Sequence, residues 1–289
     1  MHERFPAPEV SVRPTPPEVL GACTEFLSHF GIDLNTIADS ETFQEALKQI
    51  DPRYQGGQHL LRFKLEAGQT QWPDETKQII NQTAEALRMH QLETPLEGHY
   101  DIVVAMAGTR QANLDRPHYA VNSQAAFGRL IIAGAQRPLD DTEKVAVANY
   151  APGAETELDL LEAAARVVES EQPGLQIEVF GLDPQLHPGK KANTHDVLEA
   201  LFIKLQADGV IRGGSRAGVV TTQVYQVATA LDARRVGRRF GLDISTAGNP
   251  SDPEIIKKRT PATYLSEIVR TLRAAILAAQ AESTGEPIP

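Results

Sequence analysis

The sequence predicts an α/β fold in which a five-stranded, mainly parallel sheet lies between layers of helices. Five short runs of apolar and β-branched residues recur between Ile102 and Thr246, and they do not alternate between apolar and polar positions. Such runs are typical of strands buried on both faces, as in a parallel sheet covered by helices. A helical pattern separates each run from the next, which indicates repeated β-α-β units. We therefore predict a Rossmann-like three-layer sandwich that is preceded by an N-terminal helical region.

The N-terminal third of the chain lacks this alternation. Residues 1 to about 16 contain four prolines and predict an extended arm. Apolar residues then recur at helical spacing in three stretches, which we expect to be helices: 17–31, 40–50 with Ser40 as its cap, and 73–91. The segment from Leu60 to Leu65 is ambiguous. The sequence thus predicts an N-terminal arm and helical region over 1–97 and a Rossmann-like domain with a C-terminal helix over 98–282.

The strands and helices of the second region follow in strict order. The expected strands are Ile102–Met106, Arg129–Ala133, Leu175–Phe180, Ala217–Thr221 and Leu242–Thr246. The expected helices between them are about Asp115–Ala126, Asp141–Ala148 with Glu155–Glu169, Thr194–Ala207 and Val224–Phe240. A last helix begins at Pro261, with Thr260 as its cap and one apolar face that includes Leu265 and Leu272.

The composition excludes several classes of partner. The chain has 28 basic and 38 acidic residues and a net charge of -10, which argues against general binding to nucleic acid or to anionic membranes. Cys23 is the only cysteine, so the sequence offers no disulfide framework and no cysteine metal site. No signal peptide is recognisable, and no apolar run is long enough to span a bilayer. We expect a soluble, cytoplasmic protein.

Candidate binding residues follow the ends of the predicted strands. In an open α/β sheet, ligands bind outside the carboxyl ends of the strands. The residues at these ends are Gly108, Thr109, Arg110, Asn113 and Arg116; Gly134, Gln136 and Arg137; Lys190, Lys191, Asn193 and Thr194; and Thr222, Gln223 and Tyr225. Cations after three successive strands of an acidic protein indicate a pocket for a phosphate or carboxylate group. The alternative is that these cations are solvated loop residues.

An acidic helix start supplies a candidate catalytic group. Glu155 and Asp159 lie one turn apart, and a carboxylate at the pocket would act as a general base or bind ribose-type hydroxyls. The helix dipole alone favours acidic residues in a first turn by about 0.3–1 kcal/mol, which accounts for Asp159. It accounts less well for Glu155 and Thr156, so we assign a site role to both, with Glu155 as the catalytic candidate.

Several other motifs have structural explanations. Asn193 or Thr194 can cap the helix that follows, although a helix N-terminus also attracts anions, and Thr222 can cap the next helix. His195 has no clustered partner and is interpreted as solvated or capping rather than as a metal ligand. A glycine-rich segment, 213–218, precedes its strand and is interpreted as a turn at the far edge of the sheet. The arginines near the end of the helix 224–240 are interpreted as a solvated face: Arg234, Arg235, Arg238 and Arg239.

The succession of motifs resembles the YdcF/SanA/ElyC-like family of poorly characterised Rossmann-like proteins. The resemblance covers roughly residues 98 to 250 and is carried by Val103–Gly108, Leu130–Ala135, Glu155–Glu157, Ala192–Thr194 and Val219–Tyr225. It implies a pocket at the glycine turns, the Asn-Thr helix start and the Thr-Thr turn, with nucleotide-type ligands and envelope-related roles. The chain departs from the family at Ala107, where a glycine is usual, at Gln226, where a histidine is frequent, and in the absence of a membrane anchor.

The sequence therefore predicts a protein that binds a small anionic or nucleotide-like metabolite. Catalysis on this metabolite is left open. Arg110, Arg116 and Arg137 would hold the anion, and Asn193, Thr194, Thr222 and Tyr225 would orient the rest. Two alternatives stay open, a non-catalytic module that senses a ligand in this pocket and a scaffold that works through its N-terminal helices. The residues identify no cofactor, substrate or oligomeric state.

Overall fold

A parallel five-stranded sheet forms the centre of the computed structural model, which describes residues 16–37, 40–50, 72–108, 111–183, 192–250, 256 and 259–284. Its strands are β2 (Ile102–Met106), β4 (Arg129–Ala135), β5 (Gln176–Leu182), β6 (Arg216–Thr222) and β7 (Asp243–Asn249). They lie in the order β5-β4-β2-β6-β7, and every neighbouring pair is parallel. The predicted fold class is confirmed.

The central strand β2 is buried along its whole length, which explains its uninterrupted apolar sequence. In register with it, Val104 lies opposite Ile131 of β4 and Val219 of β6. Side chains alternate between the two faces of a strand, so β2 contributes to two separate cores. Val103 belongs to one of them and Val104 to the other.

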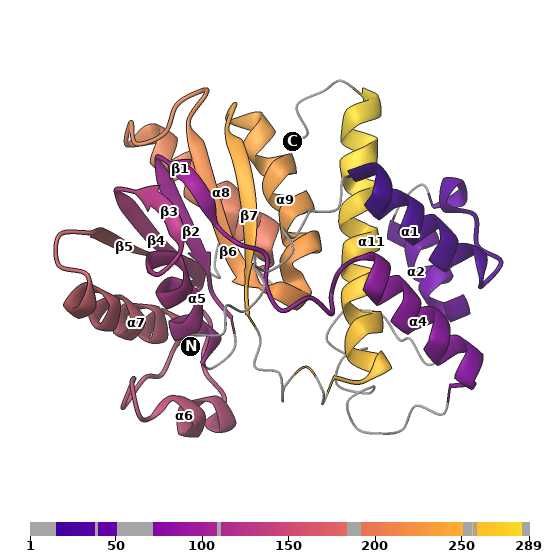
Figure 1. The fold of residues 1–289 in the computed structure, drawn as a ribbon, viewed down its shortest axis with the longest axis horizontal. Coiled ribbons are helices and arrows are strands. Elements are labelled where there is room, and N and C mark those ends of the chain that lie inside the picture. The colour runs from indigo at the N-terminus through magenta and orange to yellow at the C-terminus, as the bar shows by residue number, and fades with distance from the viewer. Residues whose placement is uncertain are drawn as a thin grey trace, which may run out of the picture.

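Helices cover both faces of this sheet (Figure 1). One face packs against α5 (Ala112–Val121) and α7 (Glu157–Glu171), and the other packs against α8 (Thr194–Ala207) and α9 (Gln226–Arg239). The short α6 (Asp141–Val147) begins with a capping box and precedes α7. This arrangement is the three-layer sandwich expected from the sequence.

A further helical layer lies outside α9. The long helix α11 (Pro261–Thr284) lies between α9 and three N-terminal helices, α1 (Pro16–Ser28), α2 (Ser40–Ile50) and α4 (Asp74–Ala86) (Figure 1). All of these helices contribute to one apolar core, which also includes Val227 and Leu231 of α9. The N-terminal helical region is thus packed onto the C-terminal helix of the sandwich. The boundary between residues 97 and 98 stays a prediction.

One predicted helix is wrong at its end. α5 ends at Val121 rather than near Ala126, and β3 (Gln124–Phe127) pairs in parallel with β1 (Glu97–Tyr100) in a separate two-stranded sheet. Ser123 starts the new segment by accepting a hydrogen bond from the Ala125 N–H through its hydroxyl. Strand pairing therefore overrides the helical preference of the alanines in this segment.

The helix expected from Val224 begins as a single 3₁₀ turn, η3 (Gln223–Tyr225), before α9. Within the described ranges, no helix combines the length and the hydropathy needed to cross a bilayer. The predicted extended arm and the segment Leu60–Leu65 fall outside the described residues, as do Thr109, Arg110, Lys190 and Lys191.

Candidate functional site

The order of the strands creates a switch point between β2 and β6. The chain passes from β2 to β4 on one side, whereas β6 adjoins β2 on the other side. In open α/β sheets, ligands bind outside the carboxyl ends of the strands at such a point. Here β2 ends at Met106 and β6 ends at Thr222, and Ala105 pairs with Val220 in register. The two strand ends therefore adjoin at the place where a ligand is expected.

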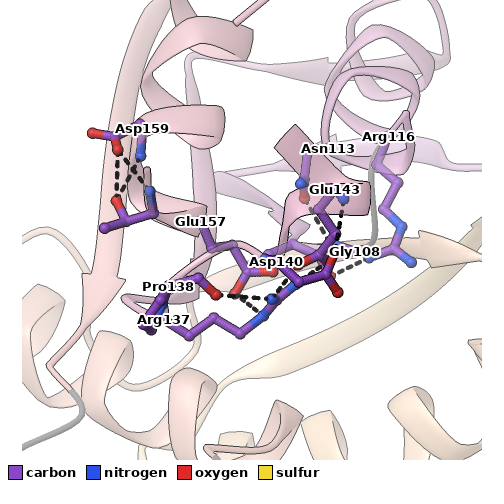
Figure 2. A network of polar contacts seen from close by, with 11 residues as sticks. Gly108, Asn113, Arg116, Arg137, Pro138, Asp140, Glu143, Glu157 and Asp159 are labelled. Atoms are coloured by element: carbon purple, nitrogen blue, oxygen red, sulfur yellow. Dashed lines mark hydrogen bonds and ion pairs between the residues drawn. The ribbon is translucent and has the colours of Figure 1, made fainter. Parts of the chain in front are cut away.

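The side chain of Arg116 occupies this switch point. It reaches back from α5 to the Gly108 turn (Figure 2), and only 2% of the residue is exposed. Its Nη1 donates to the backbone oxygens of Met106, at 2.7 Å, and of Ala107. Its Nε and Nη2 donate to Oγ1 of Thr222 at 3.1 and 3.0 Å. One guanidinium group thus links the ends of the two strands.

The guanidinium of Arg116 is buried, and the part of the chain that the structure describes supplies no direct counterion for it. No residue within the described ranges forms an ion pair with it. Burial lowers the pKa of Arg116 to about 10, against the opposing fields of Tyr225, Glu157 and Asp115 and with the added repulsion of Arg270. A buried charge is costly unless it is paired. The site is therefore electrostatically suited to an anion.

Beside the Gly108 turn, two side chains of α5 have hydrogen-bond donors that lack an acceptor among the described residues. Asn113, 1% exposed, accepts from the Gly108 N–H through Oδ1 at 2.7 Å, while its Nδ2 has no hydrogen-bond partner among the residues described. Among the residues that the structure describes, four hydrogen bonds use four of the five N–H groups of Arg116 and leave one without an acceptor. Asn113 and Arg116 are three residues apart on α5 and share one face of it. Both groups need an acceptor.

Gly108 makes room for the guanidinium. A Cβ atom at this position would lie 2.8 Å from Cζ of Arg116 and 2.8 Å from Cβ of Ala112. Only glycine allows the backbone to approach the arginine this closely. The glycine that ends the first strand therefore has a steric role in the site.

A second cation lies near the ring of Tyr225. The Cζ atoms of Arg116 and of Arg270, from α11, lie 6.0 and 5.7 Å from the centre of the Tyr225 ring. Nη2 of Arg270 donates to the hydroxyls of Thr194, at 2.8 Å, and of Thr229, at 3.3 Å. The structure thus brings together Arg116, Thr194, Thr222 and Tyr225, which the sequence predicts for the site. It adds Arg270, which sequence reasoning missed because the residue lies in a mostly apolar helix after the last strand.

Arg137, also predicted to hold an anion, already has carboxylate partners (Figure 2). Its Nη1 and Nη2 donate to the two carboxylate oxygens of Glu143, each at 2.7 Å, and its Nε lies 3.5 Å from Oε2 of Glu157. These bonds, with that to Glu143 foremost, raise the pKa of Arg137. Arg137 therefore differs from Arg116 in having its own counterions.

The candidate base Glu155 lies on the surface. Its side chain is 71% exposed and forms an ion pair with Lys144 of α6, whose pKa it raises. The helix begins two residues later than expected, so the buried carboxylate at its start is that of Glu157. The sequence-based role of Glu155 stays a prediction, and its carboxylate points to Lys144 rather than to the switch point.

Asp159 has the structural role expected for it. Its Oδ2 accepts from the N–H groups of Glu155 and Thr156 at 2.9 and 2.8 Å, and Thr156 in turn caps the Asp159 N–H. The backbone hydrogen bonds hold the pKa of Asp159 below its usual value. Thr156, like Asp159, belongs to the capping box of α7.

The remaining candidates serve turns and caps. A Cβ on Gly134 would lie 2.4 Å from Cβ of Ala107, so this glycine lets the ends of β2 and β4 close together. Gln136 is exposed, and its backbone N–H donates to Leu182 O at 2.9 Å. Asn193 caps α8 by accepting from the Asp196 N–H at 3.2 Å. These three residues lie at the carboxyl edge of the sheet, and none of them carries a charge that could bind an anion.

Three structural interpretations are wrong. The Thr222 hydroxyl makes no cap bond, because it is engaged by Arg116. Arg235 is largely buried beside Asp232, with 3.8 Å between the two side chains, instead of being solvated. His195 is also largely buried, which lowers its pKa. Within the described ranges, no group of three or more metal-ligating side chains is present.

Comparison with known proteins gives distant relatives. Three proteins described as uncharacterized, one from Mycobacterium bovis and two from Mycobacterium tuberculosis strains CDC 1551 and H37Rv, are each 27% identical to the chain over 249 residues. These matches cover 70% of this chain and 66% of each relative, so the chain spans just under two thirds of the length of these curated relatives. No family model matches the chain, and no solved structure matches it significantly. The resemblance to the YdcF/SanA/ElyC-like family therefore stays a prediction.

Proposed function

We propose that this protein binds a small metabolite through an anionic group, a phosphate or a carboxylate, at the switch point between β2 and β6. The observation that supports it is Arg116, a cation that is buried at the expected ligand position without a direct counterion among the described residues. An anion there would supply the missing charge. This account keeps the sequence-based ligand class and moves its centre to Arg116.

The donors at the site define how the anion is held. The unused N–H of Arg116 and the Nδ2 of Asn113 would each donate to an oxygen of the ligand. Hydrogen bonds in which the donor or the acceptor is ionised are roughly twice as strong as those between neutral groups. The ring of Tyr225 adjoins the cation and would pack against the uncharged part of the ligand, which fits a nucleotide-like molecule. The cytoplasmic location stays a prediction.

The proposal is tested by thermal unfolding at constant ionic strength with inorganic phosphate, a dicarboxylate, a sugar phosphate and a nucleoside monophosphate. A ligand that binds only the folded state at a hundred times its Kd stabilises that state by about 2.7 kcal/mol, so at least one of these anions should raise Tm by several degrees. Arg116→Gln should abolish the increase.

Two further variants make this test decisive. Arg216 stacks on Tyr100 at the opposite edge of the sheet, with its Cζ 5.4 Å from the ring centre, and Arg216→Gln should leave the increase intact. If Arg116→Gln fails to fold, Asn113→Asp keeps the acceptor for the Gly108 N–H and puts a carboxylate beside Arg116, which should exclude the anion. The proposal is wrong if none of these anions raises Tm, or if Arg116→Gln and Asn113→Asp respond like the wild type.

A further inference from the structure

The site contains two cations from distant parts of the chain. Arg116 belongs to α5 and Arg270 to α11, yet both guanidinium groups lie within 6.0 Å of the centre of the Tyr225 ring. Their Cζ atoms are therefore no farther apart than the sum of the two ring distances. The field of Arg270 lowers the pKa of Arg116, so the two positive charges repel each other. The fold maintains this repulsion.

Arg270 is held firmly in this position. Its Nη2 donates to the hydroxyls of Thr194 and Thr229, and its Nη1 lies 3.6 Å from the Glu267 carboxylate on the same helix. Asp232 of α9 also acts on it electrostatically. These contacts anchor the guanidinium from α8, α9 and α11 at once, so it does not need to move to receive a ligand.

The N-terminus of α8 adds to the positive field on the Arg270 side. Thr194, which accepts from Arg270, is the first residue of this 14-residue helix. The amide groups of a helix N-terminus carry about half a positive charge and attract anions. The capping box of this helix already includes the Asp196 carboxylate, so Arg270 is the main positive group for a second anion, separate from the pair formed by Arg116 and Asn113.

We infer that the ligand carries two neighbouring anionic groups, as a diphosphate does, with one group bound at Arg116 and Asn113 and the other at Arg270 and the start of α8. This inference rests on the proposed function and specifies its ligand class. Arg270 already lies 3.6 Å from the Glu267 carboxylate, a looser contact than the bidentate pair of Arg137 with Glu143. A group with two linked anions would add a partner for Arg270 as well as for Arg116, whereas a single anion would serve only one of the two cations. Free diphosphate and a nucleoside diphosphate share this chemistry.

The experiment is isothermal titration of the full chain with inorganic phosphate and with inorganic diphosphate. The wild type should bind diphosphate on the order of tenfold or more tightly than phosphate. Arg270→Gln should remove most of this preference while changing the phosphate affinity by less than about threefold. Arg270→Lys, which keeps the charge, should retain part of the preference. The exposed Arg273 lies one turn farther along α11, and Arg273→Gln should behave like the wild type.

The outcomes separate this inference from the proposed function. Equal affinities for the two anions in the wild type, or an equal loss of both in Arg270→Gln, would overturn the diphosphate inference and leave an anion site at Arg116. Binding of neither anion by the wild type would overturn both. If Arg270→Gln does not fold, Arg270→Lys decides, because a reduced preference supports the inference and a preference equal to that of the wild type overturns it. Repeating the titration with a nucleoside diphosphate shows whether the rest of the ligand adds affinity.

Discussion

At the scale of single residues, the difference between Arg116 and Arg137 determines where an anion is expected. Both arginines follow strand ends, and the sequence treats them alike. Arg137 binds Glu143 in a bidentate pair, whereas the partners of Arg116 among the described residues are backbone oxygens and a hydroxyl. Sequence reasoning could identify the two candidates. It could not distinguish them, because counterions come from residues that only the fold brings together.

Gly108→Ala tests the close packing around Arg116. The new Cβ would lie 2.8 Å from both Arg116 Cζ and Ala112 Cβ, so it must displace a buried guanidinium or the helix. Overpacking of this kind costs about 1–3 kcal/mol, measured as the free energy of unfolding in urea. Gly128→Ala is the control, because nothing lies within 4 Å of the Cβ atom that alanine would add there. Equal stability of the two variants would contradict the packing described for Gly108.

The pH dependence of stability has an identifiable contribution from Asp159. Because its backbone hydrogen bonds lower its pKa in the folded state, it stabilises the fold at neutral pH and loses this contribution as the pH falls below its unfolded value of about 3.8. Asp159→Asn should therefore lower Tm at pH 7. The difference in Tm between this variant and the wild type should be smaller near pH 3. Thr156→Ala removes a cap worth about 0.5–2 kcal/mol at both pH values. A gap for Asp159→Asn that is the same at pH 7 and pH 3 would contradict this assignment.

At the scale of elements, the strands were predictable because their sequences report burial directly. The bounds of β2 match the prediction fully, since its apolar run begins after Asp101 and is ended by the glycine turn at Gly108. β3 was missed because Gln124–Phe127 has the composition of a helix end and acquires its strand form by pairing with β1. The local sequence indicates whether a strand is buried, but it does not indicate which strand it pairs with.

The closure between the ends of β2 and β4 can be tested with a double mutant. Gly134→Ala would place a Cβ 2.4 Å from that of Ala107, and we expect a loss of about 1–3 kcal/mol in unfolding free energy. Adding Ala107→Gly removes the clashing atom and should restore part of the loss, which gives a favourable coupling energy of about 0.5–3 kcal/mol. Leu161 Cδ1, 3.0 Å from the same Cβ, limits the recovery. Additive effects of the two substitutions would show that the two strand ends do not meet as described.

At the scale of the whole molecule, α11 connects the N-terminal helices to the sandwich. Its buried residues share one apolar core with α1, α4 and α9, and it also carries Arg270 into the site. The sequence predicts this helix and its apolar face, but it separates the chain into two regions at about residue 98. The shared core could not be foreseen, because helix periodicity shows which face is buried and not which helix covers it.

This shared core predicts cooperative unfolding. Trp72 is the only tryptophan and packs against the core of α1, α4 and α11, so its fluorescence reports on the helical layer, whereas circular dichroism reports on the whole chain. The two urea transitions should coincide. Ile268→Ala, at a fully buried position of α11, should shift both by about 2–5 kcal/mol, while Leu92→Ala, at an exposed position, should shift neither by more than about 0.5 kcal/mol. A shift of the fluorescence transition alone would show that the helical layer unfolds separately.

The central claim is that an anion joins Arg116 at the switch point of the sheet. The most direct measurement is a crystal structure of the chain with tungstate, a heavy analogue of phosphate, located by its anomalous scattering. The account predicts an anomalous peak within hydrogen-bond distance of Arg116 Nη2 and Asn113 Nδ2, and its loss in Arg116→Gln. A peak only at the opposite edge of the sheet, beside Arg129 or Arg216, or no peak at all, would contradict it.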